Sequence, residues 1–370
     1  MKTLPAQILL GICTVLAVNA YTTLSDDTLR KIPSPNEDFN IKTGKLLSPI
    51  LIPRVSGTKG STIVQTHFIE WFQTHLPKWK IEFQNSTSTT PVSGNKKIPF
   101  VNIIFTRDPP WARPGDVGRL VLAAHYDSKY DPPGFIGAID SAAPCAMLMH
   151  AARSVDEALT QKWNAMESDG LKGLGEEQGV QILFLDGEEA FQQWTDTDSL
   201  YGSRSLAETW EMTPHAVMSI YRNPLSAISL LVLLDLLGGP STTVPSYFET
   251  THWAYKNLAT IEFRMRSLGL LRSQASVGPI FPDHDKTFFA PGFMIQDDHI
   301  PFMARGVEIL HLIPSNFPSV WHTMEDSGEN LDIPTTEDWA KIVTVFLSEW
   351  MDLEGYFPAI THKERRKNEL

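Results

Sequence analysis

The sequence contains little cysteine and little clustered positive charge. Cys13 and Cys145 are the only two cysteines among 370 residues, too few for a disulfide framework or for a zinc site built from cysteines. Lys and Arg number 31 against 43 Asp and Glu, so the formal net charge is -12, and a basic cluster occurs only in the tail segment 362–367. Binding to a nucleic-acid backbone depends on clustered positive charge. We therefore expect no nucleic-acid partner.

Apolar residues are abundant, and the N-terminal apolar run is too short to span a membrane. Hydrophobic residues make up 42% of the chain and charged residues 20%, which suits compact folding around a large core and excludes disordered classes. The run from Ile8 to Val18 falls short of the roughly 20 residues that a spanning helix needs. Small residues ending at Ala20 follow it, as in a secretory signal peptide. We predict that residues 1–20 are removed and that residues 21–370 form one domain, with no membrane attachment after cleavage.

Two short motifs fit a chain in the secretory pathway. Asn85-Ser86-Thr87 is an N-glycosylation sequon in a Ser/Thr-rich stretch, which predicts a surface loop of a secreted glycoprotein. The last four residues, Lys367-Asn368-Glu369-Leu370, differ at one position from the Lys-Asp-Glu-Leu retrieval signal of the endoplasmic reticulum. The alternative is a charged, solvated tail. We expect secretion, and the sequence leaves retention in the endoplasmic reticulum open.

Short apolar runs alternate with longer amphipathic stretches along the chain. The runs are rich in Val, Ile and Leu, which suits strands buried on both faces of a sheet. They cover residues 100–105, 120–124, 180–185, 230–234 and 309–313. Apolar residues at helical spacing predict helices over residues 62–76, 142–158 and 336–353. Because no repeat or linker divides the chain, the pattern predicts a single α/β domain with a mostly parallel or mixed sheet.

Polar residues directly follow the apolar runs, where the predicted strands end. In open α/β sheets, ligands bind beyond the carboxyl ends of the strands, so these residues can converge on one crevice. They are His125, Asp127, Asp140, Glu188, Glu189, Asp235 and His322. Taken singly, each has a structural alternative, with Asp140 as a helix N-cap, Asp235 as a turn residue and His322 as a packed histidine.

Together, these carboxylates indicate a bound metal ion. Several carboxylates in one partly buried crevice repel one another unless they are protonated or balanced by a cation. Lys129 is the only lysine or arginine beside these motifs. Oxygen ligands with one imidazole suit zinc, and a catalytic zinc typically keeps three protein ligands and an open position, whereas calcium does not require the histidine. In the pair Glu188-Glu189, one carboxylate can bind the metal while its neighbour moves protons.

Aromatic residues flank the acidic and histidine motifs. Trp194 follows the glutamate pair, and Phe317 and Trp321 precede His322. Such residues can wall off a small apolar pocket beside the metal. The alternative for each of them is ordinary packing in the core or at its rim.

At these motifs the sequence closely resembles the animal-type glutaminyl cyclases, the glutaminyl-peptide cyclotransferase family of the zinc aminopeptidase superfamily. The resemblance extends in order from His125 to Asp332. The matching stretches are HYDSKY, GAIDSAAPCAM, FLDGEEAFQQW, DSLYGSR, LLVLLDLLGGP, IQDDHIPF, GVEILHLIPS and VWHTMEDSGENLD. The resemblance implies a zinc exopeptidase-like fold, with a central mixed sheet flanked by helices on both faces.

The resemblance also implies a set of site residues. It implies one zinc ion per chain held by Asp140, Glu189 and His322, with Glu188 as the residue that transfers protons. A hydrogen-bonded acid pair falls on Asp235 and Asp297. The implied pocket aromatics are Trp194, Phe317 and Trp321.

The activity implied by the resemblance is that of an acyltransferase. Its substrates are peptides and proteins with N-terminal Gln, or more slowly Glu, and its product is a pyroglutamyl terminus. The alternative is a two-zinc aminopeptidase of the same superfamily, which takes its second metal through His125 and Asp235, with Asp140 bridging. Asp297 favours the cyclase because it is placed to pair with Asp235. A non-catalytic relative would have lost a ligand or the base, and none is lost.

One position departs from the family pattern. Secreted relatives commonly bridge a cysteine just before the histidine of the first motif to a cysteine in the next helix. Here the strand position is Ala124, while the helix keeps Cys145. Because the predicted ligands are intact, we expect the site to survive without this disulfide.

Overall fold

The computed structural model is built around one six-stranded sheet. It describes residues 21–173, 177–240, 242–273, 278–290 and 294–358. The strands lie in the order β1-β2-β4-β3-β5-β6, and they are β1 (Lys80–Ser88), β2 (Ile98–Arg107), β3 (Val117–His125), β4 (Glu177–Leu185), β5 (Ile228–Leu234) and β6 (Ile309–Leu312). β2 is antiparallel to both β1 and β4, whereas β4, β3, β5 and β6 are parallel to one another. The predicted mixed sheet is confirmed.

All five apolar runs form strands, and the sequence missed only β1 among the strands of this sheet. β1 lies at the sheet edge and pairs with β2 alone. Most of its side chains are exposed or half-buried, with only Gln84 buried, so no apolar run marks it. Asn85 is an exposed residue of this strand. The prediction of a loop at the sequon is therefore wrong, although Asn85 is at the surface.

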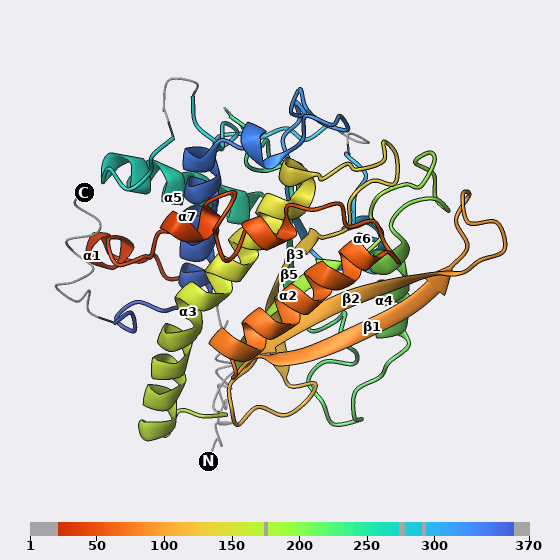
Figure 1. Ribbon diagram of the computed structural model, residues 1–370. Helices are drawn as coiled ribbons and strands as arrows, with labels where there is room; N and C mark the ends of the chain where they lie inside the picture. Colours follow the sequence, from red (N-terminus) through yellow and green to blue (C-terminus); the bar gives the residue numbers. More distant parts are fainter. Residues whose placement is uncertain (1–20, 174–176, 241, 274–277, 291–293, 359–370) are drawn as a thin grey trace, which may run out of the picture.

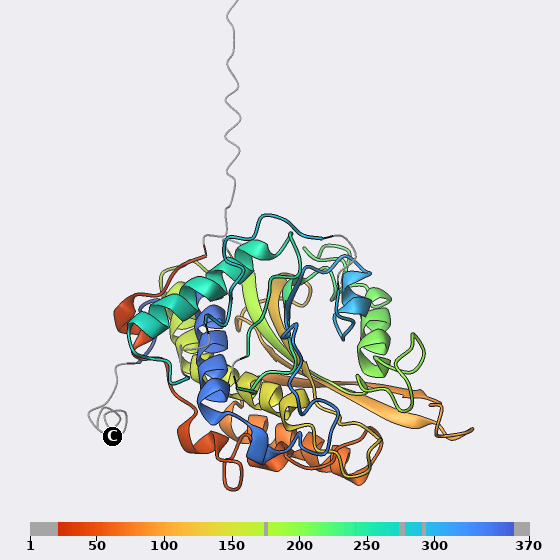
Figure 2. The same cartoon turned by 90° about the horizontal axis from the view of Figure 1, so that it is seen from above.

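Helices cover both faces of the sheet (Figures 1 and 2). They are α1 (Asp26–Leu29), α2 (Lys59–His75), α3 (Ala143–Ser168), α4 (Tyr201–Glu211), α5 (His252–Ser267), α6 (Ile300–Met303) and α7 (Ile333–Trp350). The apolar cluster on one face contains residues of α2, α3, α5 and α7. The cluster on the opposite face contains residues of α4 and α6. The structure is therefore a three-layer α/β/α arrangement.

Alternation along β3 shows how the sheet serves two cores. Leu120, Leu122 and Ala124 belong to the larger cluster, and Val121 and Ala123 belong to the smaller one. Successive strand side chains point to opposite faces, so a strand covered on both sides must be apolar at every position. This requirement explains the unbroken apolar runs in the sequence.

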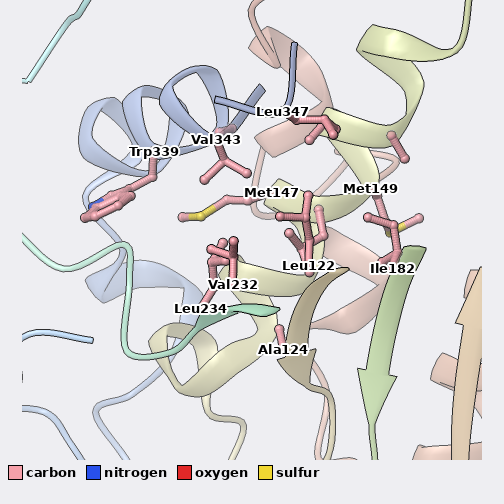
Figure 3. Packing of buried hydrophobic residues seen from close by; sticks show 14 of the residues in the cluster. Leu122, Ala124, Met147, Met149, Ile182, Val232, Leu234, Trp339, Val343 and Leu347 are labelled. Carbon is pink, nitrogen blue, oxygen red and sulfur yellow. The ribbon is translucent and has the colours of Figure 1, made fainter. Parts of the chain in front are cut away.

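The larger core packs α3 and α7 against the sheet (Figure 3). Met147 of α3 lies between sheet residues such as Val232 and the α7 residues Trp339 and Val343. All of these side chains are almost completely buried. Burial of apolar surface contributes about 25 cal/mol per Å², so this layer supplies much of the rigidity on which the sheet edge depends.

The three predicted helices are confirmed, with shifted ends. α2 begins after Thr58, whose side chain accepts a hydrogen bond from the Ser61 N–H, and α7 begins after Asp332, whose side chain accepts from the Thr335 N–H. Both are N-cap interactions. α3 continues to Ser168, ten residues beyond its predicted end at residue 158. The sequence did not predict α1, α4, α5 or α6.

The parallel strands β4, β3, β5 and β6 end at one edge of the sheet. The loops that follow them therefore meet there. Within the described ranges, no helix has the length and apolar character needed to cross a membrane. The predicted signal peptide, residues 1–20, and the tail segment 367–370 lie outside the described residues.

Cys145 is a buried free cysteine in the first turn of α3. Its thiol donates a hydrogen bond to the carbonyl oxygen of His125, 3.2 Å away. Burial raises the pKa of this thiol to about 12, so it is not a reactive thiolate. The cysteine is an apolar packing residue here.

Replacing Ala124 by cysteine is expected to create a disulfide with Cys145. The two side chains share one buried cluster. A disulfide that closes the loop between residues 124 and 145 stabilises the native state by about 3 kcal/mol, because it constrains the unfolded chain. Thiol titration and denaturant unfolding, with and without reductant, measure the effect. Ala123→Cys is the matched control and should keep its thiol free, since residue 123 faces the other cluster. Two free thiols in oxidised Ala124→Cys would contradict the prediction.

Candidate metal centre and active site

The ends of the parallel strands bring the predicted polar residues together. His125 is the last residue of β3, Asp235 directly follows β5, and the Glu188-Glu189 pair follows β4. Asp140 comes from the segment before α3, and His322 from the loop after β6. All are buried except His322, whose side chain is 29% exposed. The structure thus brings these residues together at the carboxyl edge of the sheet, where the sequence placed them.

Asp140, Glu189 and His322 form one candidate metal-binding group. Their candidate ligand atoms all lie within 4.8 Å of one another. His322 Nε2 is 3.5 Å from Asp140 Oδ2 and 3.6 Å from Glu189 Oε2. The three residues come from distant parts of the chain, and the structure assembles the set that the resemblance implied.

These residues fit a zinc ion. Glu189 Oε1 is buried and has no hydrogen-bond partner in the structure, and a buried carboxylate oxygen without a partner is costly. Two carboxylates with one imidazole are typical zinc ligands and leave room for a further ligand. The partial exposure of His322 leaves the group accessible from solvent.

A second group shares Asp140 with the first. The ligand atoms of His125, Asp140 and Asp235 also lie within 4.8 Å of one another. His125 Nε2 is 3.0 Å from Asp140 Oδ1 and 3.4 Å from Asp235 Oδ1. Burial alone would lower the pKa of His125, but hydrogen bonds to Asp127, Asp140 and Asp235 raise it well above its usual value. The ligands expected for a two-zinc peptidase are therefore assembled as well.

The glutamate pair lies in a strongly acidic environment. Burial raises the pKa of Glu189 well above its usual value, and the Asp140 charge raises it further, while the Lys129 charge lowers it. Burial likewise raises the pKa of Glu188; His125 lowers it, and Glu189 raises it. Lys129 Nζ is 3.4 Å from Glu189 Oε2. A divalent cation would balance this excess of carboxylates.

Asp127 fixes the backbone of the glutamate pair. Its two carboxylate oxygens accept hydrogen bonds from the Glu188 N–H at 3.1 Å and the Glu189 N–H at 3.2 Å. Gly187, just before the pair, has φ +78°, and a Cβ there would lie 2.4 Å from a ring atom of Phe100. The sequence marked Asp127 as a strand-end residue but gave no hint of this role.

Two structural alternatives can now be decided. Asp140 does not cap α3. The N-cap residue of that helix is Ala142, and the helix has no side-chain hydrogen bond at its N-terminus. Asp235 does stabilise a turn, since its Oδ1 accepts a hydrogen bond from the Leu236 N–H at 2.8 Å. The same carboxylate accepts a hydrogen bond from the Ser141 hydroxyl.

Asp297 lies beside the site and contacts a histidine that the sequence did not mark. Asp297 Oδ2 is 2.7 Å from His311 Nε2, and Asp297 Oδ1 accepts from the Asp298 N–H at 2.6 Å. Burial and the nearby Asp235 charge raise the pKa of Asp297 well above its usual value. A direct hydrogen bond between Asp297 and Asp235 stays a prediction. His311 lies within the apolar run of β6, which concealed its role.

The three predicted pocket aromatics fall into two places. Trp321 stacks on His322 with ring centroids 3.7 Å apart, and Phe317 packs against Trp321 at 4.8 Å. Trp194 donates from Nε1 to Gln296 Oε1 at 2.8 Å, next to Asp297. These rings are half-buried or, for Trp321, 38% exposed. Their part in a substrate pocket stays a prediction.

The fold and the site define a class of hydrolase-like metalloenzymes. Residues 102–347 match the family described as Peptidase family M28. This range contains the second half of β2, all of β3 to β6 and every predicted site residue. The match thus covers the sheet edge at which the ligands meet.

Relatives define the family more narrowly. The chain is 43% identical to glutaminyl-peptide cyclotransferase of Bos taurus over 311 residues, 83% of this chain and 81% of the relative. It is 42% identical to that of Boiga dendrophila over 312 residues, 83% and 80% of the two chains. The crystal structure of Macrostomum lignano glutaminyl cyclase has a TM-score of 0.72 and 31% identity, covering 90% of this chain and 96% of that one. The chain belongs to the glutaminyl-peptide cyclotransferase family within Peptidase family M28.

Removal of any ligand of the first group is expected to release the metal. Asp140→Ala, Glu189→Ala and His322→Ala should each lose zinc and activity together, because three protein ligands are the usual minimum for a tight site. Elemental analysis of the purified proteins measures the zinc. His284→Ala is the control, since its side chain is half-exposed and outside the group. Full zinc content in two of the three ligand variants would rule out this ligand set.

Proposed function

We propose that this protein converts N-terminal glutaminyl residues of peptides and proteins to pyroglutamyl residues and releases ammonia, acting more slowly on glutamyl residues. The observation that carries the proposal is a buried Glu188 adjoining a complete ligand group of Asp140, Glu189 and His322. It occurs in a chain that is 43% identical to a glutaminyl-peptide cyclotransferase. The protein is thus an acyltransferase that moves an acyl group from one nitrogen to another.

The reaction exchanges one carbon–nitrogen bond for another. The substrate α-amine attacks the γ-carbonyl carbon, the new amide bond closes a five-membered ring, and the bond to the side-chain nitrogen breaks. One zinc ion per chain, held by Asp140, Glu189 and His322, would supply a Lewis acid for the γ-carbonyl oxygen. The α-amine of a peptide ordinarily has a pKa of about 7.7 to 8.0, so a useful fraction is neutral near pH 7 and no activated water is required.

Glu188 carries the proton between the two nitrogens. The carboxylate accepts the proton that the α-amine loses on attack and returns it to the departing nitrogen, which leaves as ammonia. The Asp127 carboxylate accepts the backbone N–H of both Glu188 and Glu189. Because that contact limits motion of the pair, Glu188 stays next to the metal ligand throughout the proton transfer.

Two further features assist the chemistry. Asp297 is held by His311 and is buried, which suits a group that helps to fix the path of the proton. Trp194, Phe317 and Trp321 would shield the reacting amide from water, which would otherwise hydrolyse it.

A two-zinc aminopeptidase is the second candidate, and the group of His125, Asp140 and Asp235 supports it. The two functions differ in metal content and in product. One tightly bound zinc per chain, with pyroglutamyl product from a glutaminyl peptide, is the outcome expected of the cyclase. Two tightly bound zinc ions, with free glutamine from the same peptide and hydrolysis of chromogenic amino acid amides, would establish the peptidase instead.

Glu188→Gln is expected to keep its zinc and its fold while losing most turnover. The loss should be on the order of 10² to 10⁴-fold, the usual contribution of a general acid–base group. Ammonia release from a glutaminyl peptide measures turnover, and elemental analysis measures zinc. Glu325→Gln is the matched control at an exposed glutamate and should keep normal turnover. Near-normal cyclisation by zinc-loaded Glu188→Gln would show that another group moves the proton.

We also propose that the chain enters the secretory pathway. The charge and apolar pattern of residues 1–20 support this, as does the exposed position of Asn85, which leaves the sequon accessible to glycosylation. Lys367-Asn368-Glu369-Leu370 would then act as a weak retrieval signal, returning part of the protein to the endoplasmic reticulum.

Deletion of residues 367–370 is expected to speed the appearance of the protein in the medium, because the retrieval receptor would no longer bind its tail. A pulse-chase experiment on cells expressing each form measures this rate. Asn368→Asp restores the full Lys-Asp-Glu-Leu sequence and should give stronger retention. Equal secretion of the intact and shortened chains would show that the tail is not a signal.

A further inference from the structure

Backbone hydrogen bonds tie the segment that carries Asp140 to the start of the helix that follows it, from the Ala142 N–H to the Gly137 oxygen and from the Ala143 N–H to the Ala138 oxygen. Asp140 and Ser141 have non-helical backbone angles, and α3 begins without a side-chain cap. Gly137, with φ +64°, folds the segment tightly, since a Cβ there would lie 2.1 Å from the Asp140 carbonyl oxygen. We call residues 136–140 the ligand loop. Because Asp140 itself is not helical, side chains from elsewhere in the chain also bond to this loop.

Arg54 holds the carbonyl groups of the ligand loop. Its side chain is completely buried. The guanidinium donates hydrogen bonds to the Ile136 carbonyl oxygen, to the Gly137 oxygen at 2.9 Å and to the Asp140 oxygen at 3.4 Å. Arg54 precedes α2 and lies outside the range 102–347 that matches the peptidase family.

Asp326 holds the amide groups of the same loop. Its carboxylate accepts hydrogen bonds from the Ile139 N–H at 2.7 Å and the Asp140 N–H at 3.3 Å. Its backbone carbonyl accepts from the Ala138 N–H at 3.2 Å. Asp326 is buried and lies four residues after His322 in the same loop. It therefore ties the segment of one metal ligand to the segment of another.

We propose that Arg54 and Asp326 are positioning residues of the metal centre. A buried cation takes the carbonyl oxygens of the ligand loop, and a buried anion takes its N–H groups, so the loop has one orientation that satisfies both. That orientation directs the Asp140 carboxylate toward His322, 3.5 Å away. Arg54 and Asp326 thus place the Asp140 carboxylate before the metal binds, and this placement raises the affinity for zinc. This proposal rests on the metal centre of the proposed function.

A purely structural role makes a different prediction from a positioning role. Loss of buried hydrogen bonds lowers the stability of any protein, whereas groups that orient metal ligands change metal affinity by about 10- to 100-fold. The affinity for zinc therefore separates the two roles. Stability alone does not separate them.

The experiment compares zinc affinity and thermal stability in three variants. Arg54→Lys keeps the charge but loses the planar fork, and Asp326→Asn keeps the size but loses the charge. Arg107→Lys is the matched control, since Arg107 is another buried arginine, bonded to Asp156 at 3.0 Å. It is the last residue of β2 and pairs with Val180 of β4, away from the ends of the parallel strands. Competition of zinc between each full-length protein and a chromophoric chelator gives the dissociation constant, and thermal unfolding of the metal-free proteins gives stability.

We expect the zinc dissociation constant to rise about 10- to 100-fold in Arg54→Lys and Asp326→Asn, and to stay unchanged in Arg107→Lys even though its unfolding temperature falls. If Arg54→Lys does not fold, Asp326→Asn decides the question. Wild-type zinc affinity in folded Asp326→Asn would overturn the positioning role. A wild-type protein that binds no zinc would instead overturn the metal centre itself.

Discussion

Burial of several carboxylates at one edge of the sheet is the constraint on which the site depends. Asp140, Glu188, Glu189, Asp235 and Asp297 are all less than a tenth exposed. Ionised groups in so little water repel one another and lose solvation. The fold tolerates this arrangement because the groups share His125 and Lys129 and because the ligand group can take a divalent cation. The carboxylates that make this region acidic are therefore also the groups that would bind the metal.

The acidic crevice requires a rigid frame, and the three-layer packing provides it. β3 is buried on both faces by two apolar clusters, so His125 at its end has little freedom. The loops that carry the other residues are fixed by backbone hydrogen bonds to buried carboxylates, with Asp127 bonded to the glutamate pair and Asp326 to the ligand loop. Carboxylates thus serve twice, as reactive groups and as acceptors that place other carboxylates.

The relatives and the geometry of the site establish different things about this protein. The relatives identify the family. The geometry shows that the ligand sets of a one-metal and a two-metal centre coexist around a shared Asp140. Asp235, which belongs to the second set only, lies 3.4 Å from His125 Nε2 and raises the pKa of Asp297 by its charge.

The sequence by itself determined the central strands, three of the helices and which polar residues meet at the end of the sheet. Strands buried on both faces must be apolar throughout, and residues 120–124 and 230–234 show this directly. Only the tertiary structure could add β1, whose polar side chains at the sheet edge leave no apolar run. The roles of Asp127, His311, Arg54 and Asp326 were likewise decided by tertiary contacts. Each of them acts by a hydrogen bond to a partner at least 14 positions away, and local sequence carries no record of which distant groups a buried side chain will meet.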